Sequence, residues 1–207
     1  MSESLTPKPF NQRKRLFLVQ LLSIVAIATL LLSRPAWSED RPFHEIIEMT
    51  GLSLVLVCIF GRLWSILYVG SRKNGELVTS GPYSITRNPL YLFSTIGAAG
   101  IGLMFGSVVV AMVLGFVSYH VFRMTAQKEA DFLQGKFPQL YPSYAARTPF
   151  FWPDIWLYRD SGETTFSPVA LRKTFLDALY FLAIFPVIEG IEYLQTTGHL
   201  PTFLWLY

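Results

Sequence analysis

The sequence of 207 residues has few charged residues, and those it has are unevenly spread. Asp, Glu, Lys and Arg make up only 15% of the chain, whereas soluble domains carry roughly 25%. From Asn88 to Phe122 there is no charged residue at all. Hydrophobic residues reach 52% and the mean hydropathy is +0.39. This composition excludes an ordinary soluble domain and indicates a single integral membrane domain.

Cysteine is nearly absent, and so are the motifs of several common enzyme classes. The single cysteine, Cys58, excludes an internal disulfide, and its apolar neighbours in the sequence indicate a packing residue. The chain has no P-loop, no GxGxxG after a strand, no GxSxG elbow and no CxxC pair. These absences argue against the nucleotide-binding, hydrolase and dithiol chemistries that those motifs support.

Long apolar runs take the place of charge. Leu16–Ser33 and Met49–Val69 each have the length of one spanning helix, and Thr174–Leu194 is a further candidate. The uncharged run 88–122 is too long for one pass and fits a tight helical hairpin with its tip at Phe105–Ser107. We therefore predict an all-α polytopic membrane bundle with about five transmembrane helices.

Two of these runs leave alternatives open. A signal peptide cleaved near Arg34–Ser38 is the rival interpretation of Leu16–Ser33. Trp37 suits an interfacial anchor, which favours the uncleaved helix. Arg62 lies inside the second run, where a charge is costly, so it should lie near the interface, snorkel towards it or face a polar cavity. Snorkelling is the simplest of these explanations.

Small residues recur at a spacing of four in the predicted hairpin, at Ala98, Gly102 and Gly106. Such a stripe allows two helices to approach closely, so it predicts a packing contact. Gly100 and Gly102 could also admit a ligand against the backbone, although packing is the simpler interpretation.

The distribution of Lys and Arg predicts the orientation in the membrane. With the N-terminus in the cytoplasm, the inner segments hold fourteen of the seventeen basic residues and the outer segments hold two, Arg34 and Arg41. This asymmetry follows the positive-inside rule. The loop Leu77–Tyr91 and the segment Arg123–Lys173 are then predicted to lie on the same cytoplasmic face.

The three histidines, His44, His120 and His199, are far apart in the sequence. In this orientation His44 and His199 lie on the outer face. We therefore predict no metal-ligand set.

Two cytoplasmic segments joined by a hairpin must meet in space. Leu77–Tyr91 combines turn residues, an Arg-Asn-Pro break and two tyrosines, so part of its backbone is free of regular pairing. The segment after the hairpin contributes Glu129 together with Tyr141 and Tyr144. Carboxylates and aromatic rings both attract cations, so these segments predict a site for a flat metabolite with a cationic centre. A helix that begins after Pro89 could add backbone donors.

The stretch Leu77–Tyr91, read as LVTSGPYSITRNPLY, resembles the signature of the isoprenylcysteine carboxyl methyltransferase family. Members of that family read LVTSG, a tyrosine, then Arg-His-Pro-x-Tyr. The resemblance extends over Gly70–Pro153, where the second half matches at Glu129, Leu133, Phe137, Tyr141, Tyr144, Thr148, Pro149 and Pro153. Family members, which are related to phospholipid methyltransferases, are integral membrane enzymes that bind S-adenosylmethionine from the cytoplasmic side. The resemblance therefore implies a cytoplasmic cofactor cleft and a methyltransferase activity.

The resemblance also implies roles for individual residues. Arg123 matches an arginine implied to orient the acceptor carboxylate, and it is the predicted catalytic residue. The implied acceptor is a carboxylate on a prenylated or other lipid-like substrate from the bilayer, and such an acceptor needs no general base. The residues implied to bind S-adenosylmethionine are Glu76, Leu77, Val78, Tyr83, Asn88, Pro89, Leu90, Tyr91 and Glu129.

The predicted organisation has four parts. Residues 1–15 form a disordered cytoplasmic segment, and residues 16–69 hold two transmembrane helices. Residues 70–153 form the methyltransferase core that the resemblance implies. Residues 154–207 form a cytoplasmic linker and the last transmembrane helix.

Three positions depart from the family pattern. Asn88 replaces a histidine, Ala130 stands where a second glutamate is common, and Pro138 replaces a glycine. Asn88 can still donate and accept hydrogen bonds, so cofactor binding can survive that change. Three alternatives stay open. Related phospholipid N-methyltransferases share the Glu-bearing helix and short hairpins, and NADPH-dependent sterol reductases share a similar Arg-x-Pro-x-Tyr layout. The departures at Asn88 and Ala130 leave open a catalytically silent membrane protein.

Overall fold

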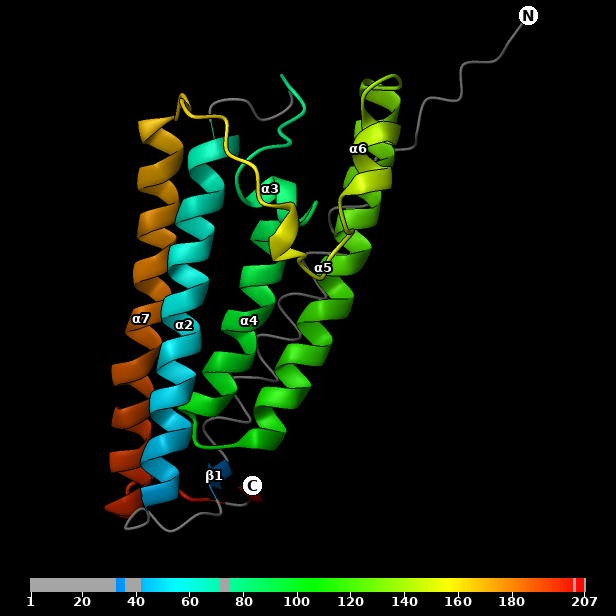
Figure 1. The fold of residues 1–207 in the computed structure, drawn as a ribbon. Coiled ribbons are helices and arrows are strands. Elements are labelled where there is room, and N and C mark those ends of the chain that lie inside the picture. The colour runs from blue at the N-terminus through cyan, green and yellow to red at the C-terminus, as the bar shows by residue number, and fades with distance from the viewer. Residues whose placement is uncertain (1–32, 36–41, 71–74, 203, 207) are drawn as a thin grey trace, which may run out of the picture.

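The computed structural model of the protein describes residues 33–35, 42–70, 75–202 and 204–206. Helices dominate this part of the chain (Figure 1). The predicted N-terminal segment 1–15 and nearly all of the predicted span Leu16–Ser33 lie outside the described residues. The helices are α2 (Pro42–Val69), α3 (Pro82–Ile85), α4 (Pro89–Met104), α5 (Val108–Lys136), α6 (Tyr141–Arg147), the 3-10 turn η1 (Ile155–Leu157) and α7 (Pro168–Thr196).

Two short strands accompany the helices. β1 (Ser33–Pro35) pairs in parallel with β2 (Leu204–Leu206), and Arg34 lies opposite Trp205. The sequence predicted an all-α chain, so this pairing was missed. Strands of three residues carry no usable alternation of apolar and polar side chains, which explains the omission.

The helix α2 begins at Pro42, whereas the sequence predicted a span from Met49 and a polar loop before it. Proline is favoured at the first helical position, because its missing N–H is not needed there. Glu45 lies in the first turn, where a carboxylate interacts favourably with the helix dipole. Polar residues that suggested a loop are therefore the first turns of the helix.

Among the described residues, three helices are long and apolar enough to cross a membrane: α2 from Phe43, α5 and α7. The helix α4 is apolar but has only 16 residues, and it forms the predicted hairpin with α5. The hairpin tip lies where the sequence placed it, because α4 ends at Met104 and α5 begins at Val108. At the tip Gly106 has φ 73°, and the Ser107 side chain accepts a hydrogen bond from the Val110 amide.

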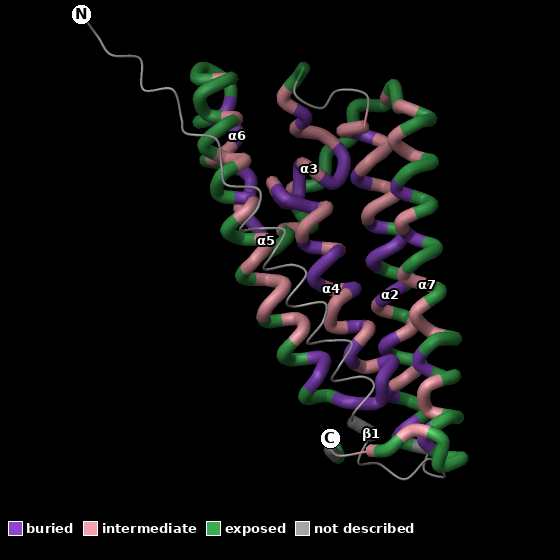
Figure 2. The backbone as a smooth tube through the Cα atoms, turned by 180° about the vertical axis from the view of Figure 1, so that it is seen from behind, coloured by how far each residue is buried: buried purple, intermediate pink, exposed green. Residues whose placement is uncertain are grey.

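The core of the bundle lies where α2 packs between α4 and α7. Buried positions run along α4 and the inner side of α2, whereas outward positions on α5 and α7 are exposed (Figure 2). Exposed outward positions include large apolar residues such as Phe116 and Tyr180. A surface of this kind suits contact with lipid, in agreement with a membrane protein.

Glycines set the close approach of the core helices. A Cβ atom on Gly102 would clash with the backbone of Ala111, and one on Gly51 would clash with the backbone of α4. Gly100 in turn faces Gly51 and Leu54 on α2. Gly100 and Gly102 therefore serve helix packing, as the simpler interpretation of their spacing predicted, and a ligand has no room at either.

We predict that Gly102→Ala destabilises the protein by about 1–3 kcal/mol, because the added methyl group forces the hairpin apart. The measurement is thermal unfolding of the detergent-purified protein. Gly190→Ala on α7 is the matched control, since a Cβ there meets no atom within 4 Å. That control should be neutral or more stable by about 0.5–1 kcal/mol. Equal unfolding temperatures for the two variants would contradict the packing role of Gly102.

Candidate functional site

A cavity of about 590 Å³ lies between α2, α4, α5, α6 and α7 at the end of the bundle that carries α3. This volume is in the range of small-molecule binding sites, roughly 300–1,000 Å³. The loop before α3 and the start of α4 form one wall, and the part of α5 beyond Ser118 forms another. The two sequence segments that were predicted to meet therefore enclose a single cavity.

All nine residues predicted to bind the cofactor line this cavity. Arg123, the predicted catalytic residue, is not among the lining residues. It is exposed on α5, where its Nη1 donates to the Tyr119 hydroxyl at 3.2 Å. The cavity residues from the prediction are Glu76, Leu77, Val78, Tyr83, Asn88, Pro89, Leu90, Tyr91 and Glu129.

Glu129 is joined to the opposite wall by Tyr91. The Tyr91 hydroxyl donates to Oε2 of Glu129 at 3.1 Å. The Tyr91 ring stacks on Phe122 with 5.5 Å between ring centroids, so both of its ends contact α5. This pair fixes a carboxylate and an aromatic face at the same place, which is the arrangement expected to attract a cation.

Tyr83 and Tyr144 remain neutral on this wall. Tyr83 lines the cavity, and burial raises the pKa of its hydroxyl well above the usual value, with a smaller contribution from the Glu129 carboxylate. Burial likewise raises the pKa of Tyr144, whose hydroxyl donates to the Tyr83 carbonyl at 2.8 Å. Neither phenol can act as a base near neutral pH, so both serve as walls and hydrogen-bonding groups.

Asn88 connects the start of α4 to the aromatic segment that follows α6. Its side-chain Nδ2 donates to the Phe150 carbonyl at 2.7 Å, and its backbone N–H donates to the Thr86 hydroxyl at 3.3 Å. The Thr86 hydroxyl donates to the Phe151 carbonyl at 2.9 Å. Asn88 is 9% exposed, so its side chain is a structural donor as well as part of the cavity wall.

Two arginines contribute positive charge to the cavity. Arg87 donates from Nη1 to the Tyr141 hydroxyl at 3.3 Å and lies over the Phe150 ring, 5.0 Å from its centroid. Arg62 on α2 donates from Nη1 to the Ser94 hydroxyl. In the described part of the chain, the Nε of each arginine is buried and has no hydrogen-bond partner.

Arg62 and Asp177 are cavity residues that the sequence did not assign to the site. For Arg62 snorkelling was the simplest expectation, and the structure instead gives the alternative, a side chain facing a polar cavity. Asp177 comes from α7, which no motif connects to the loop around Tyr83. The available signal was physical: a charge inside a membrane helix needs a polar surrounding.

The chain is thus a helical membrane protein with a partly open cavity lined by charged, aromatic and apolar side chains. The sequence model of the phospholipid methyltransferase family matches residues 47–139, which run from α2 through the loop and the hairpin to just beyond the end of α5 and so include Glu129. The cobalt-zinc-cadmium resistance protein CzcN of Cupriavidus metallidurans is 34% identical over 191 residues, which cover 91% of this chain and 87% of that protein. The chain belongs to the phospholipid methyltransferase family.

A second relative matches over slightly more of the chain. The nickel-cobalt-cadmium resistance protein NccN of Alcaligenes xylosoxydans xylosoxydans is 30% identical over 197 residues, covering 95% of this chain and 92% of that protein. No solved structure matches the chain.

We predict that Asn88→Asp destabilises the protein by about 1–3 kcal/mol at pH 8, because a carboxylate oxygen would face the Phe150 carbonyl without a proton to share. Asn88→His retains a donor and should be less harmful. Thermal unfolding in detergent measures both, with Gln134→Glu as an exposed amide-to-acid control on α5. If Asn88→Asp is no worse than Gln134→Glu, the Asn88–Phe150 hydrogen bond does not stabilise the wall.

Proposed function

We propose that the chain is an S-adenosylmethionine-dependent methyltransferase that transfers the methyl group to a carboxylate on a lipid-like molecule. The observation that carries the proposal is the Tyr91–Glu129 pair facing into a cavity that two arginines also line. The family match over residues 47–139 supports methyl transfer as the reaction class.

The cation-attracting side of the cavity suits the methyl donor. The Glu129 carboxylate and the Tyr91 ring would hold the donor's amino group and sulfonium, with Asp177 as a further carboxylate. The apolar side chains Leu77, Val78 and Leu90 would contact its flat base. S-adenosylmethionine supplies an activated methyl group, so the protein has to align the acceptor and exclude water.

The anion-attracting side suits the acceptor. Arg62 and Arg87 each present a guanidinium, which can bind a carboxylate through two parallel hydrogen bonds. A carboxylate is already the nucleophile, so no proton has to be removed, which agrees with the neutral phenols of Tyr83 and Tyr144. The new bond joins a carboxylate oxygen to the methyl carbon, and the carbon–sulfur bond breaks with its electrons returning to sulfur.

We place the cavity and the N-terminus on the cytoplasmic side, because fourteen of the seventeen basic residues then lie inside. The acceptor would reach the cavity from the bilayer. We also infer that the reaction serves tolerance to divalent transition metals, because CzcN and NccN are named for such resistance.

We expect Glu129→Gln to weaken binding of S-adenosylmethionine roughly 10- to 100-fold, the effect of losing one charge-assisted hydrogen bond. Equilibrium binding to the detergent-purified protein measures this. Asp131→Asn is the matched control, because it lies two residues further along α5 and is exposed outside the cavity.

Two outcomes would count against this part of the proposal. Binding of NADPH in place of S-adenosylmethionine would favour the reductase alternative. Unchanged binding of S-adenosylmethionine by Glu129→Gln would show that the donor site lies elsewhere.

Cells that express the Glu129→Gln chain should tolerate zinc, cobalt and cadmium less well than cells with the wild-type chain. Equal tolerance would separate the reaction from metal resistance.

For the acceptor, we expect labelled methyl groups to enter a lipid extract in a form that mild alkali releases, as an ester does. Arg62→Gln and Arg87→Gln should each lower the rate by roughly tenfold or more, since each removes a charge-assisted contact. Arg147→Gln, an exposed arginine on α6, is the control.

An alkali-stable product would exclude carboxyl methylation and favour a phospholipid amine. Arg123→Gln tests the role that the family resemblance implies. If only that arginine variant is slow, the acceptor lies on the outer side of α5 near Tyr119, and the cavity arginines serve structure.

A further inference from the structure

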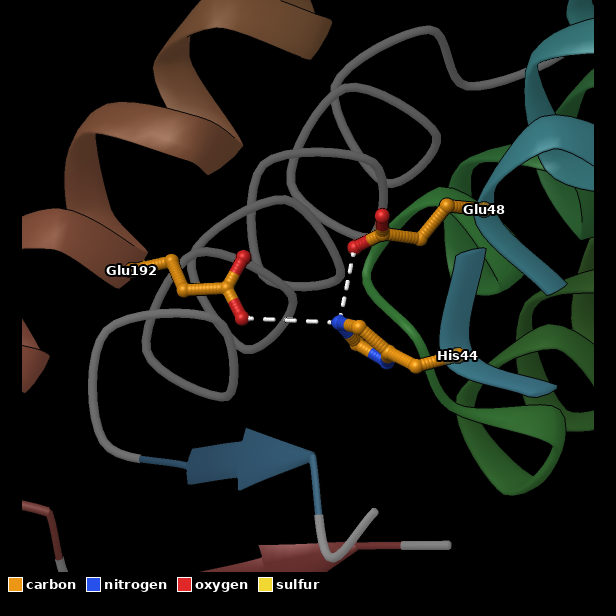
Figure 3. A network of polar contacts seen from close by, with 3 residues as sticks. All are labelled: His44, Glu48 and Glu192. Atoms are coloured by element: carbon orange, nitrogen blue, oxygen red, sulfur yellow. Dashed lines mark ion pairs between the residues drawn. The ribbon is translucent and has the colours of Figure 1, made fainter. Parts of the chain in front are cut away.

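Three potential metal ligands converge at the end of the bundle opposite the cavity. His44 and Glu48 lie one turn apart near the start of α2, and Glu192 lies near the end of α7 (Figure 3). A spacing of four residues places His44 and Glu48 on the same face of α2. Because α2 and α7 are antiparallel neighbours, that face meets Glu192 (Figure 1).

The distances between the three ligand atoms are close to those between the ligands of a single metal ion. His44 Nε2 lies 3.0 Å from Oε1 of Glu48 and 3.6 Å from Oε1 of Glu192. One ligand atom from each of the three residues lies within 4.8 Å of the others. Tetrahedral ligands at about 2.0–2.2 Å from a zinc ion are roughly 3.3–3.6 Å apart. Small side-chain adjustments would therefore let all three contact one ion.

The three groups of the cluster are largely buried, and two of them are carboxylates. The imidazole side chain is only 6% exposed, and the carboxylate side chains are 18% and 19% exposed. Two carboxylates outweigh one imidazole, so the three groups carry a formal charge of −1 with a protonated ring and −2 with a neutral ring. Glu45 and Glu189 add negative potential at Glu48. Buried charges of this kind are ordinarily paired or coordinate a metal.

The histidine ring is directed into the cluster. Its Nε2 faces both carboxylates, as Figure 3 shows, whereas the buried Nδ1 has no hydrogen-bond partner in the described part of the chain. Nε2 is thus the ring atom that the cluster engages, and a neutral imidazole offers a lone pair there. The partly exposed carboxylates give an ion a route from the surface.

We propose that His44, Glu48 and Glu192 bind one divalent transition-metal ion of the zinc, cobalt or nickel type. One imidazole nitrogen with two carboxylates favours such ions over Mg²⁺ or Ca²⁺, which prefer all-oxygen sites. Three protein ligands leave a fourth position open to water or another ligand, as in sites that exchange their ligands. The ion would join α2 to α7 at the end of the bundle opposite the cavity. This metal site does not depend on the proposed methyl-transfer reaction.

The test uses the full chain in detergent without a polyhistidine tag. Equilibrium dialysis should give one Zn²⁺ per chain, and Co²⁺ should give visible absorption bands of a site with nitrogen and oxygen ligands. His44→Ala, Glu48→Gln and Glu192→Gln should each weaken binding more than about tenfold, because even the loss of an outer partner of a metal ligand costs roughly 10- to 100-fold. Zn²⁺ should also raise the unfolding temperature of the wild type more than that of the variants.

Matched controls make the result specific. His120→Ala and Glu163→Gln remove an exposed histidine and an exposed glutamate elsewhere and should bind Zn²⁺ as the wild type does. Glu129→Gln should do the same, which separates this site from the cavity. The two glutamine variants keep the side-chain shape, so the test survives if His44→Ala fails to fold. Equal binding by the wild type and all three ligand variants, absence of Zn²⁺ binding, or equally tight binding of Mg²⁺ would overturn the proposal.

Discussion

Every backbone polar group at the mouth of this bundle needs a hydrogen-bond partner, and the arrangement of the cavity depends on that constraint. Residues 75–88, between α2 and α4, are largely irregular apart from α3, and all but the first two are buried or half-buried, so helix formation cannot supply most of their partners. The segment after α6 supplies them instead: the amides of Gly81 and Arg87 donate to the carbonyls of Arg159 and Pro149 at 2.8 and 2.9 Å, and the Asp154 amide donates to the Ile85 carbonyl at 2.9 Å. These contacts hold the two segments together, and the cavity lies beside them.

The same constraint explains why the cavity residues are so far apart in the sequence. Tyr91 can meet Glu129 only because the hairpin returns α5 beside α4, and Tyr144 can meet Tyr83 only because α6 turns back over the loop. The charged side chains of the cavity are thereby carried on three helices, α2, α5 and α7, and on the loop before α4. A rigid site of this kind favours alignment of two reactants over proton transfer, which agrees with a methyl group that arrives already activated.

Much of the fold follows from local sequence features. The tip at Phe105–Ser107 was predicted because glycine and serine interrupt an uncharged run, and it lies between the end of α4 and the start of α5. The start of α2 was misplaced by seven residues, because Glu45 and Glu48 look like loop residues until their helical neighbours are known. The pairing of β1 with β2 depends on contacts between the two ends of the described chain, and no local pattern records it.

The residues of the candidate site show the same difference between features that are local in the sequence and contacts between distant segments. Leu77–Tyr91 and Glu129 were found because motif and topology both pointed to them, and all of the predicted cofactor residues line one cavity. Arg62 was assigned to the interface because the sequence does not show Ser94 across from it. The contact of His44 with Glu192 was not predicted, because Glu192 lies far away in the sequence. Arg62 and His44 each have a partner on another helix, and one sequence alone gives no means of pairing them.

The shortness of α4 has a consequence for the surrounding lipid. Sixteen residues span about 24 Å, whereas the hydrocarbon layer is about 30 Å thick. Where the hairpin faces the bilayer, local thinning would relieve this mismatch and would draw the headgroups of one leaflet towards the hairpin. A polar headgroup on an apolar tail would thereby come nearer to the level of the cavity. The membrane's own thickness then becomes one of the variables that set how readily a lipid-borne molecule reaches the protein.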